Sequence, residues 1–373
     1  MSDPVFLYDP MVMLAETSYQ IVFNTALPGM GWAEVDGQRF YDEAAGLIRS
    51  DRTVHRAAVP AGLLDRAGGY TVCFQPVLDR KPYYPETGPV QRRAYAFRPV
   101  DWSDGLQLYQ LADTHAQVER PVAAAQRFGD RLDLLVLNGD IDNHADSPAE
   151  FLTAFDIASR LTGGERPILY ARGNHDTRGH AAPQLLEYIP TVAGDTFYAF
   201  RTGPLWGLVL DCGEDKADGQ IEYGGVVAFD SFRRRETAFL RRVLEEGAWK
   251  DPSIRLKLAV CHIPFTEDLG RSNPIFGIGN EYYGEWVELL NRMGIHLLLC
   301  GHMHRAYFTR PGGSLDFRGQ QFPTAVGSDP SFATRQGEGF LGLALETGPE
   351  LDAAAVCFTD SAGEEQGRLE LIL

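Results

Sequence analysis

Six short apolar runs that alternate with helical stretches organise the chain after residue 101. Apolar residues fill nearly every position of these runs, as expected of strands covered on both faces. The alternation predicts a layered α/β domain with a largely buried sheet. A capping box with proline at the first helical position opens one helix at residue 147, and glycines close all three helices. The predicted strands span residues 106–112, 132–137, 168–170, 205–210, 256–260 and 295–300, and the predicted helices span residues 147–163, 232–246 and 284–293.

Residues that can bind metal ions follow five of the six runs. Ligands of open α/β sheets bind beyond the carboxyl ends of the strands, so five such segments can converge although they span almost two hundred residues. The segments are Asp113-Thr114-His115, Gly139-Asp140, Gly173-Asn174-His175-Asp176, His262 before Ile263-Pro264, and Gly301-His302-Met303-His304.

The residue types in these segments constrain the ion. Carboxylate, imidazole and amide donors without cysteine suit Mn, Fe or Zn. Seven candidates exceed what one ion needs if it must also bind water and substrate, but with Asp140 as a bridge they fit two ions. His175 is the one motif histidine left over, and it is the predicted general acid, with Asp176 fixing its orientation directly or through an intermediary. The seven candidates are Asp113, His115, Asp140, Asn174, His262, His302 and His304.

The ordered motifs Asp-x-His, Gly-Asp, Gly-Asn-His-Asp, His before x-Pro and Gly-His-x-His resemble the calcineurin-like metallophosphoesterase superfamily over about residues 105–310. The resemblance implies an α/β (α+β) fold, a β-sandwich of two mixed sheets flanked by helices that the C-terminal strands complete. It also implies that Asp113, His115, Asp140 and His304 hold one metal, and that Asp140, Asn174, His262 and His302 hold the other.

The function expected from these features is a dinuclear metal-dependent phosphoesterase. A hydroxide that bridges the metals would attack a phosphate mono- or diester in line, and His175 would protonate the leaving oxygen. The alternative is a non-catalytic scaffold or binding protein with the same fold. Such scaffolds usually lose ligand residues, and none is missing here.

The first 100 residues carry short β-type runs separated by turns, which predicts a small all-β sandwich ahead of a catalytic domain at residues 101–373. The spacing of Leu64 six residues before Tyr70 resembles the tyrosine corner of fibronectin III domains, in which the phenol binds upstream backbone.

A fibronectin III-like domain ahead of such a catalytic domain is similar to the arrangement in purple acid phosphatases. Asn143 stands where their metal-binding tyrosine would be, so we expect a colourless enzyme. An independent protein- or carbohydrate-binding role for the N-terminal region is a further possibility. The runs span residues 11–14, 19–25, 32–35, 54–59, 70–75 and 93–98.

Substrate contacts are less clearly marked. Arg172 and Arg178 flank the Asn-His-Asp motif and are candidates for bidentate phosphate binding, and Arg305 is a weaker one. Two glycine-rich segments, residues 212–230 and 265–283, are expected to form walls or lids over the site. We expect His55, His144, His180 and His296 to be core or surface residues, and Asp142 to be a solvated turn carboxylate.

Composition narrows the partners. The formal charge of −17 argues against binding to nucleic acid polymers or anionic membranes, which leaves a small-molecule phosphate ester as the expected substrate. No signal sequence or membrane-spanning run is visible, and the five scattered cysteines fit reduced thiols, so a cytoplasmic location is expected. The oligomeric state is left open.

Overall fold

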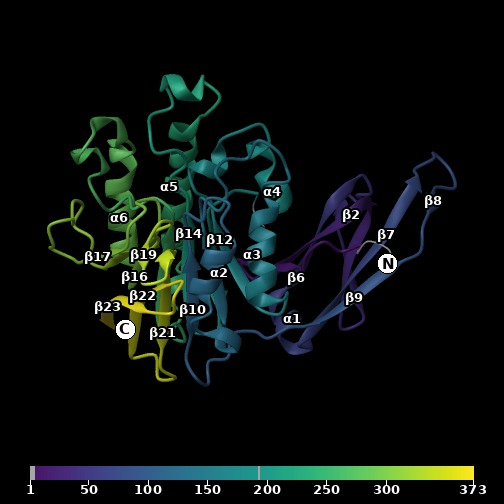
Figure 1. The fold of residues 1–373 in the computed structure, drawn as a ribbon, viewed down its shortest axis with the longest axis horizontal. Coiled ribbons are helices and arrows are strands. Elements are labelled where there is room, and N and C mark those ends of the chain that lie inside the picture. The colour runs from purple at the N-terminus through teal and green to yellow at the C-terminus, as the bar shows by residue number, and fades with distance from the viewer. Residues whose placement is uncertain (1–4, 192–193) are drawn as a thin grey trace.

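The fold of residues 5–191 and 194–373, described here from a computed structural model, consists of two β-sheets packed face to face with helices on both outer faces (Figure 1). One core lies between the sheets and includes Leu108 and Leu134 of the first sheet and Leu258 and Leu299 of the second. Two further cores join each sheet to its helices. This arrangement confirms the predicted α/β fold class.

The first sheet is mixed, and its central strands β10, β11 and β12 run parallel. Both the beginning and the end of the chain contribute strands to it. In spatial order it contains β23 (Glu365–Ile372), β22 (Ala353–Asp360), β21 (Leu341–Thr347), β10 (Gln107–Leu111), β11 (Leu134–Asn138), β12 (Pro167–Ala171), β1 (Met11–Ala15), β2 (Ser18–Val35), β7 (Gly69–Asp79) and β8 (Glu86–Thr87). Off this path, β3 (Gln38–Tyr41) and β6 (Arg52–Pro60) pair with β2, and β9 (Gln91–Ala96) pairs with β7.

The second sheet is also mixed, with β14, β15, β16 and β18 parallel. All six strands predicted after residue 101 are present, so their carboxyl ends lie at one edge of each sheet. The order is β13 (Tyr198–Thr202), β14 (Leu205–Leu210), β15 (Leu256–Cys261), β16 (Leu297–Cys300), β18 (Thr324–Val326) and β17 (Tyr307–Thr309). Two small hairpins are β4 (Glu43–Ala44) with β5 (Leu47–Ile48), and β19 (Ala333–Thr334) with β20 (Gly337–Glu338).

The three predicted helices correspond to α3, α5 and α6, and each ends at a glycine in the left-handed conformation. Helix α3 begins later than expected, because Ser147 and Glu150 form a turn in which the Ser147 amide donates to Glu150 Oε2 at 2.5 Å. Among the described residues, no helix has both the length and the apolar character needed to cross a bilayer. The helices are α1 (Ala61–Ala67), α2 (Glu119–Ala125), α3 (Leu152–Thr162), α4 (Leu185–Tyr188), α5 (Phe229–Glu246) and α6 (Asn280–Met293).

The N-terminal strands continue the first sheet. Strand β1 pairs in parallel with β12, with Val12 opposite Pro167, and in antiparallel fashion with β2. Val12 and Leu14 belong to the same core as Leu108 and Leu134. In Figure 1 these strands extend to one side of the molecule, and the β7–β8 arm projects farthest. The proposed division at residue 100 therefore crosses a continuous sheet and a shared core, and a separate fibronectin III-like domain stays a prediction.

The prediction of a tyrosine corner at Tyr70 is wrong. The Tyr70 hydroxyl donates to the carbonyl of Gly164 at 2.7 Å, on the turn that follows α3, rather than to upstream backbone. The segment before it forms helix α1. Tyr70 takes this partner because the N-terminal strands pack directly against the turn between α3 and β12, so the residue ties the two regions together.

Candidate metal centre

The seven predicted ligands meet where strands of both sheets end. Two groups, each with its donor atoms within 4.8 Å of one another, lie there: Asp113, His115 and His304 form one, and Asp140, His262 and His302 form the other. Asn174 joins the second group, since its Oδ1 lies 2.9 Å from His302 Nδ1. The strand-end argument thus located a set of residues that the fold brings together.

The backbone at these strand ends is unusual. Five of the seven residues have positive φ angles, a conformation that is costly for residues with a Cβ and that concentrates at functional sites. The turns also approach one another closely, because a Cβ at Gly139 would lie 2.6 Å from Gly173 Cα. Only glycine permits that approach, which brings Asp140 beside Asn174. The positive φ angles are 52° at Asp113, 46° at His115, 51° at Asp140, 70° at His302 and 50° at His304.

The buried group is organised around His262. Its Nδ1 donates to the carbonyl of Asn138 at 2.6 Å, which turns Nε2 toward Asp140 Oδ2 at 3.2 Å and Asp113 Oδ1 at 3.6 Å. Burial lowers the pKa of His262, but the nearby carboxylates of Asp140 and Asp113 outweigh it and raise that pKa to about 10. His262 Nε2 and Asp113 Oδ1 are buried without a hydrogen-bond partner. These two atoms are both possible metal ligands and face each other, an arrangement that fits a bound cation.

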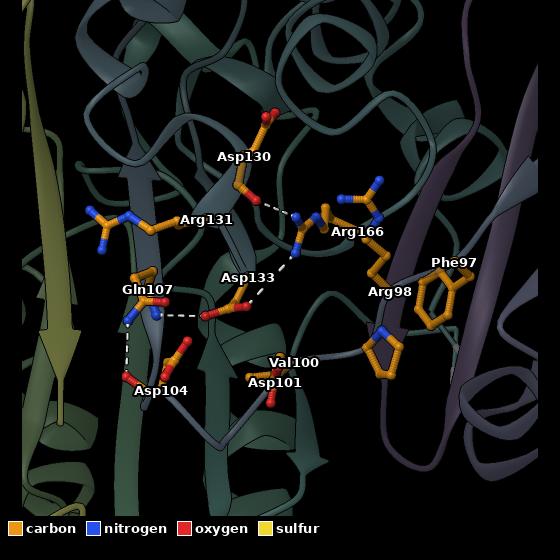
Figure 2. A pocket seen from close by; sticks show the side chains of 11 residues that line it. Phe97, Arg98, Val100, Asp101, Asp104, Gln107, Asp130, Arg131, Asp133 and Arg166 are labelled. Atoms are coloured by element: carbon orange, nitrogen blue, oxygen red, sulfur yellow. Dashed lines mark hydrogen bonds and ion pairs between the residues drawn. The ribbon is translucent and has the colours of Figure 1, made fainter. Parts of the chain in front are cut away.

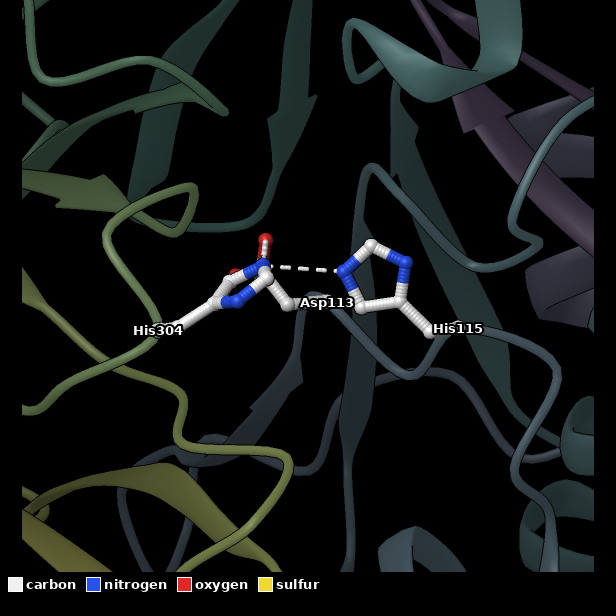
Figure 3. A group of neighbouring side chains, drawn as sticks. All are labelled: Asp113, His115 and His304. Carbon is white, nitrogen blue, oxygen red and sulfur yellow. Dashed lines mark hydrogen bonds and ion pairs between the residues drawn. The ribbon is translucent and has the colours of Figure 1, made fainter.

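The more open group is shown in Figure 3, where the rings of His115 and His304 approach each other and Asp113 lies next to His304. The Nε2 atoms of the two histidines are 2.9 Å apart, and His304 Nε2 lies 3.4 Å from Asp113 Oδ1. The other carboxylate oxygen of Asp113 accepts from the His302 amide at 2.8 Å and from the Ser328 hydroxyl. Asp113 therefore offers one oriented oxygen to the site and is fixed by the other.

The donor types present in the two groups fit transition-metal ions. Carboxylate and imidazole dominate, and no thiol contributes. A third group of His144, Asp146 and Glu150 lies at the surface, where Asp146 Oδ2 is 3.2 Å from His144 Nε2. Clusters of exposed acidic groups are common without a metal, so we assign no site to it.

His175 lies beside the two groups and is oriented by backbone. Its Nδ1 is 2.6 Å from the carbonyl of Asn143, so Nδ1 carries the hydrogen and Nε2 faces the site, 4.0 Å from Asp140 Oδ2. Asp176 is predicted to orient His175 directly or through an intermediary, and the direct contact is wrong. Its Oδ2 accepts from the Gly173 amide at 2.8 Å and from the Tyr170 hydroxyl at 3.0 Å, so it holds the loop that carries His175, and the indirect role stays a prediction.

The predicted arginines are both engaged by buried carboxylates. Arg178 binds Glu214 through two hydrogen bonds of 2.8 Å, and its Nη1 lies 3.2 Å from His175 Nε2. Arg172 Nε lies 2.7 Å from Asp211 Oδ2, and its guanidinium packs over the rings of Phe229 and Phe232. Only Arg178 reaches a residue of the site. Arg172 has no hydrogen bond or ion pair to either group among the described residues, so its predicted contact with phosphate stays a prediction.

A cavity of about 350 Å³ opens over the two groups, and we call it the metal-facing cavity. Asp140, Asn174, His175, His302 and His304 form its floor. The predicted walls are confirmed, because the two glycine-rich segments contribute Asp215 from one and Leu269, Ser272 and Phe276 from the other. Its volume suits a phosphate group with part of an ester.

A larger cavity of about 680 Å³ lies at the opposite end of the parallel strands (Figure 2). Gln107, Asp133 and Arg166, which stand at or just before the amino ends of β10, β11 and β12, line it. Asp133 and Arg166 are already paired within this cavity. Asp133 Oδ2 accepts from the backbone amide of Gln107 at 2.9 Å, and Arg166 Nη1 lies 3.8 Å from Asp133 Oδ1. Neither of the two candidate metal-binding groups contributes to its described lining, so we do not assign the reaction to it.

Sequence reasoning missed several supporting residues. Ser328 donates to Asp113 and comes just after β18, so the same strand-end argument could have found it. The carbonyls of Asn138 and Asn143 orient His262 and His175, and no side-chain pattern marks a carbonyl. Asp142 is also a correction. It is buried and accepts from Thr153 Oγ1 at 2.6 Å, and burial raises its pKa to about 7.

Comparison with known proteins agrees with this geometry. The calcineurin-like phosphoesterase family model matches residues 106–306, more than half of the chain, and the chain belongs to that family. It is therefore a metal-dependent hydrolase that acts on phosphoric esters.

Solved structures with the same fold extend beyond the matched segment. A purple acid phosphatase, PPD1, from yellow lupin (Lupinus luteus) seeds superposes with a TM-score of 0.60 at 11% identity, over 97% of this chain and 73% of that one. PhoD superposes with a TM-score of 0.53 at 11% identity, over 96% of this chain and 91% of that one. A search of curated proteins finds no match. These likenesses concern the fold, and they include the N-terminal region.

Proposed function

We propose that the protein is a dinuclear phosphoesterase for small phosphate esters. The observation that carries the proposal is the pair of adjacent ligand groups, with the unpartnered His262 Nε2 and Asp113 Oδ1 between them. Asp113, His115, Asp140 and His304 would hold one ion, and Asp140, Asn174, His262 and His302 would hold the other. Asp140 suits a bridging role because Oδ1 is fixed by the His175 amide at 2.8 Å while Oδ2 faces His262.

When bound, two such cations supply charge that offsets the phosphoryl oxygens and lowers the pKa of a water between them. The protein's own residues then position the ester. The metal-facing cavity places it against Asn174, His175 and His304. Leu269 and Phe276 on the wall restrict water at the same cavity, which strengthens the interactions between charges inside it.

His175 is the proposed general acid. A proton for the leaving oxygen has to sit on Nε2, since Nδ1 is committed to Asn143. Nε2 at present accepts from Arg178 Nη1 at 3.2 Å. If Arg178 donated this N–H to a phosphoryl oxygen instead, Nε2 would be free to hold a proton. Arg178 would then link binding of the ester to protonation of His175 Nε2.

A non-catalytic scaffold is the competing proposal, and the intact ligand set argues against it. We also propose a cytoplasmic location, which the five free, buried cysteines support. The substrate class includes both monoesters and diesters, because the metal-facing cavity has room for either.

The proposed function is tested by measuring hydrolysis of 4-nitrophenyl phosphate and of its bis-ester after loading the purified chain with Mn, Fe, Zn or Mg in turn. We expect turnover that a strong chelator abolishes and that added metal restores, with about two ions per chain by elemental analysis. Metal-free material that hydrolyses either ester at full rate would exclude the proposal, and full metal loading without any turnover would favour the scaffold.

A further inference from the structure

A second cavity of about 650 Å³ lies beside the metal-facing cavity, and we call it the side cavity. Arg178 and Glu214 connect the linings of the two cavities. Arg178 lines the side cavity and touches His175 of the metal-facing cavity. Glu214 lines the side cavity, and its neighbour in the chain, Asp215, lines the metal-facing cavity. The side cavity is therefore next to the residue proposed to protonate the leaving oxygen.

Both arginines that line the side cavity are already paired with carboxylates. Glu214 neutralises Arg178, and Asp211 neutralises Arg172 at 2.7 Å. Glu222 Oε1 lies 2.7 Å from Lys216 Nζ, and Asp146 Oδ2 lies 3.2 Å from His144 Nε2. No unpaired arginine or lysine of the described lining remains to compensate an anionic ligand that would lose its hydration there, which makes an anionic occupant unfavourable.

Apart from the charged residues and the polar side chains of Thr177, His180 and Tyr223, the lining is mostly apolar. Val226, which is 87% exposed to solvent, and Phe229, which is buried, belong to the same segment, so the lining contains both an exposed aliphatic and a buried aromatic side chain. Binding sites for organic molecules are mostly apolar cavities of this size, with few polar groups. The apolar lining residues are Ala182, Pro183, Val226, Val227, Ala228 and Phe229.

We propose that the side cavity binds the alcohol part of the ester, and that this alcohol is uncharged and apolar, of the aryl or arylalkyl kind. This inference rests on the proposed function, since it places the leaving group on the His175 side of the phosphate. The ester then spans both cavities, with its phosphate over the metal groups and its organic part against Val226 and Phe229. Nucleotide-like or polyphosphate leaving groups fit the side cavity poorly.

The test compares 2-naphthylmethyl phosphate with methyl phosphate in the metal-loaded full chain. Both esters release primary alcohols, so the ratio of their kcat/KM values reports on contact with the organic part. We expect wild type to prefer the naphthyl ester. Val226→Asp and Val226→Lys at the rim, and Ala228→Trp, which fills the cavity, should each lower the ratio by roughly tenfold. Ile221→Asp is the matched control, because Ile221 is 96% exposed on the same loop but does not line the cavity, and it should leave the ratio unchanged.

Binding of 2-naphthalenemethanol, followed by its fluorescence, separates failure of this inference from failure of the proposed function. We expect binding to wild type and to Ile221→Asp that is weakened in the lining variants, whether or not any ester is hydrolysed. Absence of binding, or an equal ratio in wild type and lining variants, would overturn the inference. A third ester, with an anionic leaving group, tests whether the cavity selects charge. If its kcat/KM relative to methyl phosphate fell in Val226→Asp and rose in Val226→Lys, the inference would also be overturned. Since Val226 is exposed, its variants remain informative if Ala228→Trp does not fold.

Discussion

Two histidines, His55 in the N-terminal strands and His262 in the metal centre, are equally buried but have opposite environments. His55 lies on β6 against the rings of Phe23 and Phe74, with Thr25 Oγ1 3.0 Å from its Nε2. Burial, with a smaller effect of Arg52, lowers its pKa to about 3. At His262 the carboxylates of Asp140 and Asp113 outweigh burial, and the pKa rises to about 10.

The difference shows what distinguishes a ligand from a core residue. Burial alone removes the proton from an imidazole, and His55 is a neutral part of the core, as the sequence analysis expected. His262 is held among unneutralised negative charge, which demands a positive partner, either a proton or a metal ion. Burial therefore does not identify the functional histidine, whereas the carboxylates facing it do.

The largest predicted effect concerns whether the two regions are separable. Deletion of residues 1–100 should abolish folding, because it removes β1 from β12 and takes Val12 and Leu14 out of the shared core. Thermal unfolding followed by circular dichroism measures this. The double change Tyr83→Ser and Tyr84→Ser is the control, since these side chains are 80% and 91% exposed and their loss should leave the transition intact. A folded, active fragment of residues 101–373 would instead identify the N-terminal region as an independent binding module.

Asp140→Ala tests the charge that distinguishes His262. Removing the proposed bridge should reduce bound metal at both positions and lower kcat/KM by more than the roughly 100-fold expected from losing a residue that only supports a ligand. Elemental analysis and steady-state kinetics measure the two effects. Asp142→Asn, two residues along the same turn and hydrogen-bonded to Thr153, is the matched control and should keep both metals. Full metal content in Asp140→Ala would show that the bridge is misassigned.

His175→Asn should come next in size, with a loss of roughly 10²- to 10⁴-fold in kcat and with both metals retained. The loss should be greatest for alkyl esters, whose leaving oxygen needs a proton, and smaller for 4-nitrophenyl phosphate. Kinetics on the two ester types, together with metal analysis, decide the matter. Near-normal turnover of an alkyl ester would remove His175 from the role of general acid.

The parts of the fold and of the candidate site that could be predicted from sequence are those that a local residue pattern encodes. Apolar runs specify strands, and polar residues behind them specify an edge, so the convergence of the seven candidate ligands was predictable from local sequence. The partners of Asp176 and Arg172, which are Tyr170 with Gly173 and the distant Asp211, were not predictable because they depend on loop geometry. The tyrosine corner failed for a similar reason, since the pairing of β1 with β12 joins positions about 155 residues apart that share no periodic signal.

The smallest predicted effect is the pH dependence of stability, in which the two histidines should act in opposite directions. His55 has a folded pKa near 3 against about 6.5 unfolded, so the unfolded chain binds more protons between these values and stability falls as pH drops below 6.5. Because one pKa unit corresponds to about 1.4 kcal/mol, the loss of folding stability caused by His55 at pH 5 is about 2 kcal/mol, and His55→Leu should remove it.

His262 in metal-free protein has a raised pKa, so its contribution to folding stability is present below pH 6.5 and is lost as pH rises toward 10. The destabilisation caused by His262→Leu should therefore shrink over that range. Urea unfolding of both variants and wild type at pH 5, 6.5 and 9, with metal removed, measures the two trends. Parallel pH trends for the two variants would mean that the carboxylates around His262 are not charged in the folded protein, and the comparison between the histidines would lose its basis.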